Sequence, residues 1–349
     1  MKRYLLSLTL SLSFLVAPSI YAKGKQQPVP KAKVSKAQTA LKTGKLSSPK
    51  LSYFRLKVLR CQKESKDAPI VLGITSKKRP AFLKKQVLAS SYPHADHYIY
   101  RSHETYVLDA NGKVKHKLQR AIKFFNHHAI DHKGDPRFAF DSKKQVLSPI
   151  NVRTFLPNGR VKSPKCNSYN VVLPGPMARA PGYSDIKQLV LTHIGLERGA
   201  ITDTEIERID RVRRRTYLWG EKVVQSDQPA GSFGLTVVVP KGTLLRYACL
   251  GCSLRPAITH SKTATTYRWI RTNVPALNPE GTSHALYATI YPRIVFSTAP
   301  SWKALRALLQ KRIAQAAILS PALSKRIAKL TRAKVATIEK VRALHHFVV

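Results

Sequence analysis

The most conspicuous chemical pattern in the sequence is a C-L-G-C motif, in which Cys249 and Cys252 are separated by two residues. A redox dithiol needs its first Cys at a helix N-terminus, where the dipole lowers the thiol pKa, but here a β-like run precedes the motif and no helix signal follows. A zinc site needs two more ligands, and His260 is the nearest candidate. A disulfide is the ordinary interpretation in an exported chain, so Cys249 and Cys252 are the disulfide candidates. With Cys61 and Cys166, three pairings are open, and free thiols also remain open.

Histidines gather in two short stretches, which raises the question of a metal site. Metal binding requires ligands that converge on one point, and side chains on strands and loops fan out. We therefore interpret these residues as surface histidines that add positive charge at acidic pH, and we predict no metal site. No glycine-rich loop with a following Lys-Ser or Lys-Thr is present, and no cofactor site is predicted. The residues concerned are His94, His97, His103, His127, His128 and His132.

The stretch "RIDRVRRRTYLW" interleaves arginines with Tyr217 and Trp219. Arg and aromatic residues together can bind single-stranded nucleic acid by stacking. The simpler interpretation is a solvated basic face, and the alternative is a contact with an acidic envelope polymer.

The charge balance is extreme, with 61 Lys plus Arg against 18 Asp plus Glu and a net charge of +43. Such a chain attracts polyanions. The N-terminus begins with Lys2 and Arg3, continues with an apolar run that is shorter than a membrane span, and reaches small residues before Lys23. We interpret residues 1–22 as a signal peptide, with an uncleaved anchor as the alternative. Export to the periplasm or cell envelope excludes a chromosomal DNA partner and favours anionic envelope polymers or lipids.

Residues 23–50 carry eight lysines and no acidic or aromatic residue. Like charges repel and nothing in this segment can be buried, so we predict a disordered basic linker. It acts either as a tether to an anionic surface or as a solvated spacer.

Residues 51–300 show repeated short β runs with turn signals. Helix-like spacing in 51–60 and 79–91 comes first. Asn111-Gly112 and Asn158-Gly159 are hairpin signals of the type I′ kind. Another pair of runs flanks Pro240-Lys241-Gly242. The pattern predicts a mainly β fold, an antiparallel β-sandwich-like domain, followed by a short helical segment.

Residues 301–349 show helical spacing of apolar residues. Ser301 is the expected N-cap of a first helix, and Ser320-Pro321 starts a second. A third follows from about Lys334, and its apolar end calls for a partner surface or for further sequence.

Several separated motifs resemble one family, in order: "YPHADHYIYRSHETYVLDANGKV", "INVRTFLPNGRV", "PGYSDIKQLVLTHIGLERGA" and "YRWIRTNVPALNPEG". Over about residues 90–300 they look like the domain of unknown function that precedes a transglutaminase-like core in exported bacterial proteins. The resemblance implies that 301–349 leads toward a core that this chain lacks. It also implies a strand, not the helix that propensity favours, for "TDTEIERIDRVRRR", with Thr202, Thr204 and Ile206 on one face.

Catalysis by a transglutaminase-like core needs a Cys nucleophile, a His base and an acidic orienter. The family places these residues beyond the end of this chain, so no catalytic residue is assigned. We expect a non-catalytic accessory domain of an exported transglutaminase-like protein, with a separate core as one partner. The alternative is a stand-alone envelope protein that binds anionic polymers. A weaker third interpretation is a cryptic enzyme that uses Cys249 or Cys252.

Overall fold

The structure is a computed structural model that describes residues 78–178, 182, 184–277 and 291–348. The expected signal peptide (1–22), the basic linker (23–50) and the helix-like stretch 51–60 lie outside the described residues. Contacts divide the described chain into two units, a β body that ends at Thr298 and a helical unit that begins at Ala299.

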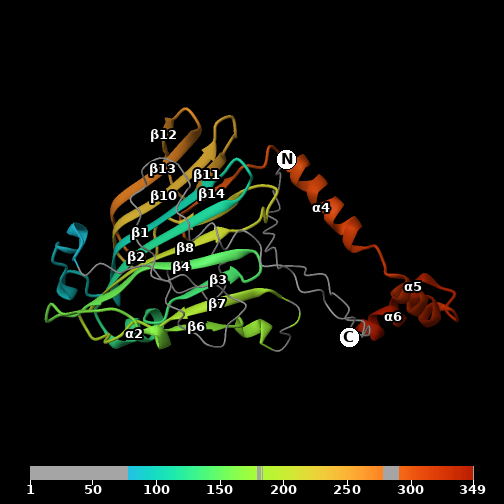
Figure 1. Ribbon diagram of the computed structural model, residues 1–349, viewed down its shortest axis with the longest axis horizontal. Coiled ribbons are helices and arrows are strands. Elements are labelled where there is room, and N and C mark those ends of the chain that lie inside the picture. The colour runs from blue at the N-terminus through green and yellow to red at the C-terminus, as the bar shows by residue number, and fades with distance from the viewer. Residues whose placement is uncertain (1–77, 179–181, 183, 278–290, 349) are drawn as a thin grey trace, which may run out of the picture. The chain divides into compact units, whose positions relative to one another are not determined.

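An eight-stranded sheet forms the centre of the β body (Figure 1). Neighbouring strands pair antiparallel, except that β1 and β10 run parallel. The fold is therefore mainly β and mainly antiparallel, as predicted. In spatial order the strands are β12 (Ala257–His260), β13 (Ala264–Val274), β10 (Ala230–Pro240), β1 (His97–Leu108), β2 (Val114–Phe124), β8 (Ile201–Asp210), β4 (Gln145–Phe155) and β5 (Val161–Lys162).

Two three-stranded sheets pack on this large sheet. The first is ordered β11 (Arg246–Leu250), β14 (Arg293–Ser297) and β9 (Trp219–Val223); the second is ordered β3 (Arg137–Asp141), β7 (Ile186–Leu191) and β6 (Tyr169–Val172). Leu235 of the large sheet shares a core with Ile294, and Ile206 shares another with Leu189. Leu235 lies opposite Glu104, which lies opposite Leu118 and then Ile206, so both small sheets cover the same face.

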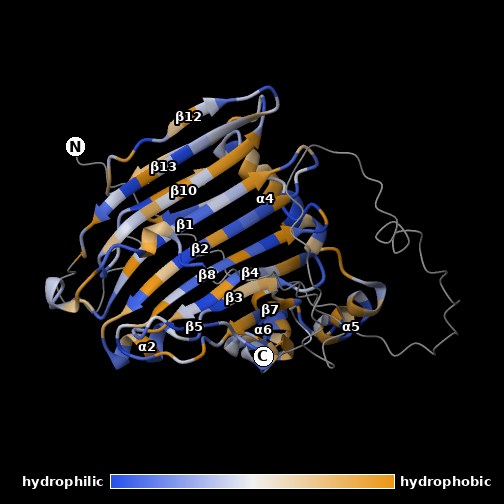
Figure 2. Ribbon diagram, turned by 60° about the vertical axis from the view of Figure 1, so that its left-hand side comes forward, coloured by the Kyte–Doolittle hydropathy of each residue, from blue (hydrophilic) through white to orange (hydrophobic). Residues whose placement is uncertain are grey.

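Alternation of polar and apolar residues specifies this layering. Figure 2 shows blue and orange segments alternating along the strands of the large sheet. On the covered face Val237 and Val239 are fully buried, whereas on the opposite face Lys115 and Lys117 pair with Glu207 and Glu205. The sandwich-like arrangement follows from this period of two.

Both Asn-Gly signals connect antiparallel strands, as predicted, but neither is a type I′ turn. Gly112 and Gly159 have φ of 75° and 81°, whereas neither Asn111 nor Asn158 has a positive φ. In each loop the Gly N–H donates to the carbonyl three residues back, and a side chain, from Asp109 or Asn158, accepts from the backbone after the turn. The glycine alone takes the left-handed position, which needs no Cβ.

The runs that flank Pro240 and Gly242 do not pair with each other, which corrects the expected strand pair. Both edges of β10 are occupied, by β1 and β13, and the following strand β11 pairs with β14. The turn at Gly242, where φ is 83°, carries the chain from the large sheet into a small one.

The segment predicted as a strand against its helix propensity is β8, with Thr202, Thr204 and Ile206 all buried. The stretch 79–91 forms two short 3-10 helices, η1 (Ala81–Leu83) and η2 (Ala89–Ser91). The remaining short elements of the body are α2 (His127–Lys133), η3 (Cys166–Ser168) and η4 (Gly175–Met177).

The helical unit contains α4 (Trp302–Ala316), α5 (Pro321–Thr331) and α6 (Thr337–Val348). The hydroxyl of Ser301 accepts from Ala304 N at 3.1 Å, and that of Ser320 from Leu323 N at 3.2 Å, so both predicted N-caps are confirmed. A search of the described residues finds no helix of the length and apolarity that a membrane span requires.

Candidate functional site

A group of interacting ionisable side chains lies between the large sheet and the small sheet that contains β9. Lys222 of β9 reaches β1, where its Nζ donates to Glu104 Oε1 at 2.8 Å and to Ser102 Oγ at 2.9 Å. On the other oxygen of the same carboxylate, Oε2 lies 3.0 Å from the Tyr106 hydroxyl and 3.0 Å from His116 Nε2. We call Glu104, Tyr106, His116, Arg208 and Lys222 the inter-sheet cluster.

Strand register brings these side chains together. Tyr106 of β1 lies opposite His116 of β2, which lies opposite Arg208 of β8. The rings of Tyr106 and His116 stack with centroids 4.1 Å apart. Arg208 Nη2 lies 3.1 Å from His116 Nδ1, and Nη1 donates to Ala139 O on β3 at 2.8 Å. The cluster thus joins the large sheet to both small sheets.

Hydrogen-bond direction fixes the state of His116. A guanidinium can only donate, so Nδ1 accepts from Arg208, and Nε2 carries the proton that it donates to Glu104. This is neutral histidine, in agreement with a pKa of His116 that burial lowers even though Glu104 acts in the opposite direction. Neither ring nitrogen is left to act as a base.

Glu104 and Lys222 form the ion pair of the cluster. Burial alone would raise the pKa of Glu104, but the hydrogen bond from His116 and the Lys222 charge outweigh burial and hold this pKa far below its usual range. Burial lowers the pKa of Lys222, and Glu104 opposes that effect. Burial, followed by the nearby Glu104 charge, raises the pKa of the Tyr106 hydroxyl. Because each of the five side chains is hydrogen-bonded to a neighbour, the cluster acts as an electrostatic clamp between the layers.

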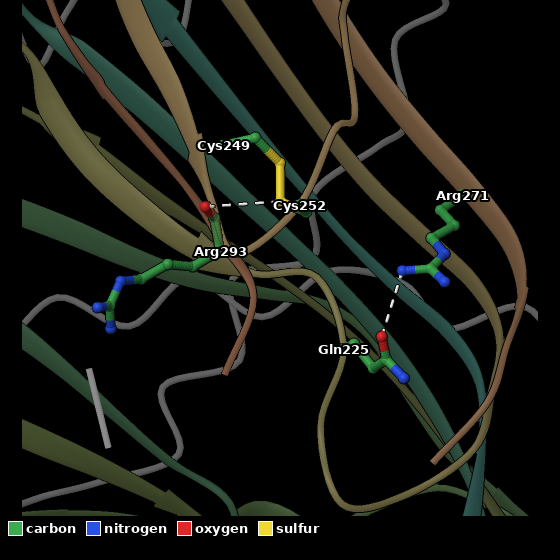
Figure 3. The surroundings of a disulfide bond; sticks show 5 residues. All are labelled: Gln225, Cys249, Cys252, Arg271 and Arg293. Carbon is green, nitrogen blue, oxygen red and sulfur yellow. Dashed lines mark hydrogen bonds between the residues drawn. A yellow bond between two sulfur atoms is a disulfide. The ribbon is translucent and has the colours of Figure 1, made fainter. Parts of the chain in front are cut away.

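Cys249 and Cys252 are joined by a disulfide with a Cα–Cα distance of 5.2 Å (Figure 3). Cys249 lies in β11, Gly251 has a φ of 68°, and Cys252 Sγ lies 3.9 Å from Arg293 O. The motif therefore sits at the end of a strand, and no helix N-terminus is present to stabilise a thiolate. Cys166 is also disulfide-bonded, so none of the described cysteines carries a free thiol.

The interpretation of all six histidines as surface residues is wrong for His97, which is buried, and His103 is partly buried. His97 is 5% exposed. The Nε2 atom of His103 lies 2.6 Å from the Ser232 hydroxyl oxygen. Burial, followed by nearby positive charges, lowers the pKa of each to about 4, so neither adds charge at mildly acidic pH. Within the described part of the chain no three His, Cys, Asp or Glu side chains could hold a metal ion.

The arginines of residues 208–215 do not form a uniformly solvated face. Arg208 belongs to the inter-sheet cluster, and Arg214 lies 3.7 Å from Asp210 and 3.9 Å from Asp141. Arg215 lies over the ring of Trp219 with its guanidinium carbon 4.6 Å from the centroid. The sequence could not show that these arginines divide between the inter-sheet cluster and an exposed aromatic ring.

A cavity of about 750 Å³ opens beside the start of β1. Its lining includes Tyr92, Tyr98, Asp227 and Asn273, the last of which has a φ of 50° and is the one described non-glycine residue with a positive φ. Sequence patterns gave no signal for this cavity, because its walls come from three separate segments: 91–98, 227–230 and 273–277.

The comparisons with known proteins agree with this architecture. Residues 110–278 match the family model DUF3857, described as a domain of unknown function with a solved structure. A search of curated proteins found no match. The crystal structure of a protein from Parabacteroides distasonis that is described as a candidate protease is similar, with a TM-score of 0.64 and 23% sequence identity.

That similarity covers 72% of this chain and 50% of the other chain, so this chain spans about half the length of the solved structure that it matches. At this identity the likeness shows the fold. The resemblance to a domain of unknown function is thus confirmed, whereas its position in front of a transglutaminase-like core remains a proposal.

Proposed function

We propose that this chain is a non-catalytic accessory module of an exported protein and that its basic surface holds it to anionic polymers of the cell envelope. The proposal combines the expected accessory role with the expected polyanion partner. In this proposal the β body contributes binding and does not catalyse a reaction.

The observation that carries the proposal is the way in which the carboxylates are used. Most of the ion-paired carboxylates are partly or fully buried. In one such pair Arg153 Nη2 lies 2.7 Å from Asp203 Oδ2. The chain has 18 acidic residues against 61 Lys plus Arg, so the charge that remains for solvent is positive. A surface of one sign attracts polyanions. Ion pairs involve Asp96, Glu104, Asp141, Asp185, Asp203, Glu205, Glu207, Asp210 and Glu221.

The helical unit is basic as well. Residues 302–348 contain eleven Lys or Arg and one acidic residue, Glu339. Trp302 and Val335 are 86% and 91% exposed. Basic and apolar side chains exposed together favour contact with an anionic surface.

The experiment is a co-sedimentation series of the mature chain with phosphatidylglycerol vesicles and with insoluble polygalacturonate, each over rising salt. We expect binding at about 0.1 M salt that fades toward 1 M, because the Debye length falls from about 10 Å to about 3 Å. Phosphatidylcholine vesicles and cellulose are the neutral controls. A variant without residues 23–50 should bind more weakly and remain folded. Absence of sedimentation at low salt would mean that the charge serves solubility alone.

A transglutaminase-like core as a partner is the second part of the proposal. It is supported by the resemblance of the motifs and by a similar solved chain of about twice the matched length. The test is to sequence the DNA that follows the codon for Val349, together with the neighbouring genes. The partnership would be supported by a reading frame that encodes a core with Cys, His and Asp, and by co-purification of that core protein with this chain. A core that stays separate from it at all salt concentrations would contradict it.

A further inference from the structure

The outer face of the β9–β14–β11 sheet carries an exposed aromatic ring among arginines. Register places Trp219 opposite Ser297, which lies opposite Arg246. The residues that alternate with them, Phe296 and Ile294, are buried against the large sheet. Trp219 and Arg246 therefore point away from the core, about 10 Å apart at two strand spacings.

Trp219 is held in a fixed position although it is 52% exposed. The Arg215 guanidinium lies 4.6 Å from the centre of its ring, and Arg215 Nη1 donates to the backbone oxygen of Trp219 at 3.2 Å. The guanidinium covers one side of the indole and leaves much of the ring open to solvent. A large aromatic side chain in such an exposed and braced position is suited to stacking on a ligand.

Besides Arg215, a second arginine lies on the same face of this small sheet. Arg246 is exposed, whereas Arg293 is buried at the opposite end of β14 from Ser297. The one acidic residue among the outward-facing strand positions is Glu221, which lies 4.0 Å from Arg293. Burial, followed by the charges of Arg214 and Arg208, lowers the pKa of Arg215, so an anion beside Arg215 would relieve repulsion between these arginines.

We propose that Trp219, Arg215, Arg246 and Ser297, the Trp219 platform, bind an acidic polysaccharide. In this proposal the apolar face of a sugar ring stacks on the indole, and carboxylates of the polymer pair with the two guanidinium groups. Arg is suited to this role because its planar fork can bind a carboxylate with two hydrogen bonds. The proposal rests on the proposed function and gives it a place and a ligand class.

Single-stranded nucleic acid is a poorer fit. Proteins that bind it without sequence preference stack successive bases on several aromatic side chains. The outward positions beyond Trp219 on this sheet are aliphatic or charged, among them Val223, Val295 and Leu250. One ring with a guanidinium over it and a second guanidinium on the nearby strand β11 suits a polymer in which one unit stacks and its neighbours carry charge.

The test uses the full chain with the substitution Trp302→Phe. The two remaining tryptophans are then the exposed Trp219 and the buried Trp269. Hexagalacturonate is titrated while tryptophan fluorescence is followed, with maltohexaose as the neutral control. We expect saturable quenching by the uronate alone. Trp219→Ala, followed by calorimetry, should weaken binding about tenfold, a typical loss for an aromatic anchor.

Arg246→Gln should weaken binding severalfold. Its matched control is Arg268→Gln, an exposed arginine on the opposite face of the large sheet, which should change affinity little. Equal losses at 246 and 268, or unchanged binding in Trp219→Ala, would overturn the platform. If whole-chain binding to polyanions persists in that case, the proposed function survives. Tighter binding of a single-stranded oligonucleotide than of the uronate at equal charge would overturn the ligand class.

Discussion

Lys222 on β9 donates to Glu104 on β1 at 2.8 Å, and this contact connects a small sheet to the middle of the large one. The side chain of Lys222 is 7% exposed and that of Glu104 is 15% exposed. An ion pair in such a place gains little over an apolar pair, but removing one partner leaves a buried charge without compensation. Loss of one of the two residues should therefore destabilise the fold more than replacement of both by uncharged side chains.

Glu104→Gln should therefore lower the free energy of unfolding by roughly 3–5 kcal/mol. The measurement is urea unfolding followed by circular dichroism. Asp185→Asn, which breaks the exposed pair with Lys143, should change it far less. The double variant Glu104→Gln with Lys222→Met should recover part of the loss. If the double variant is as unstable as the sum of both single variants, the two residues are not coupled.

Stability should fall in mildly acidic solution because of two buried histidines, His97 and His193, and the partly buried His103. Burial lowers the pKa of His97, His103 and His193 to about 4. An unfolded histidine takes up its proton near pH 6.5, so between about pH 6.5 and 4 the unfolded chain binds more protons. The stabilisation is complete above that window and is lost as the pH falls through it.

The measurement is the urea midpoint at several pH values between about 7 and 4.5. His193 is hydrogen-bonded to Thr204 at 2.9 Å, and His193→Gln should flatten the pH dependence as well as lower stability. His94→Gln, at an exposed position, should leave the slope as in the parent chain. A slope that is unchanged in His193→Gln would show that His193 is not one of the groups responsible.

Local signals in the sequence predicted much of the fold. Asn111-Gly112 and Asn158-Gly159 mark connections between antiparallel strands, and Ser301 and Ser320 cap helices, because each of these features depends on residues only a few positions apart. The strand β8 was predicted from the family resemblance, since its own propensity favours a helix.

Long-range pairing was beyond such signals. The runs on both sides of Gly242 look like partners in sequence, yet β10 has two other neighbours. The inter-sheet cluster unites Glu104, His116, Arg208 and Lys222, which four different strands supply, and only the register reveals that they meet. The available sequence signal for the cluster was a polar residue, such as Glu104, at a strand position that faces the core. That signal cannot be recognised until it is known which face of the strand points inward.

Two glycines should respond differently to substitution. Gly159 has a φ of 81° and open space where a Cβ would lie, so Gly159→Ala should lose about 1 kcal/mol from backbone strain alone. Gly159→Asn should lose less, because Asn tolerates that region. At Gly220 a Cβ would lie 2.6 Å from Phe296, which is buried. Gly220→Ala should lose roughly 1–3 kcal/mol by overpacking.

The measurement for the glycine variants is again urea unfolding, together with near-ultraviolet circular dichroism. Gly220→Ala should alter the aromatic signal, and Gly220→Asn should be worse than Gly220→Ala. Rescue by Asn at position 220 instead of 159 would contradict the assigned causes.

The disulfide between Cys249 and Cys252 closes a very short loop, and it should act as a local staple without redox activity. Loop-closure entropy for so few residues predicts that Cys249→Ser with Cys252→Ser lowers the free energy of unfolding by about 2 kcal/mol. Adding a reductant to the parent chain also affects the bond at Cys166, so its effect should exceed that of the double variant.

The parent chain should not accelerate insulin reduction by dithiothreitol, because Cys249 lies on a strand and lacks a helix dipole to stabilise its thiolate. Acceleration that disappears in the double variant would revive the interpretation as a cryptic thiol enzyme.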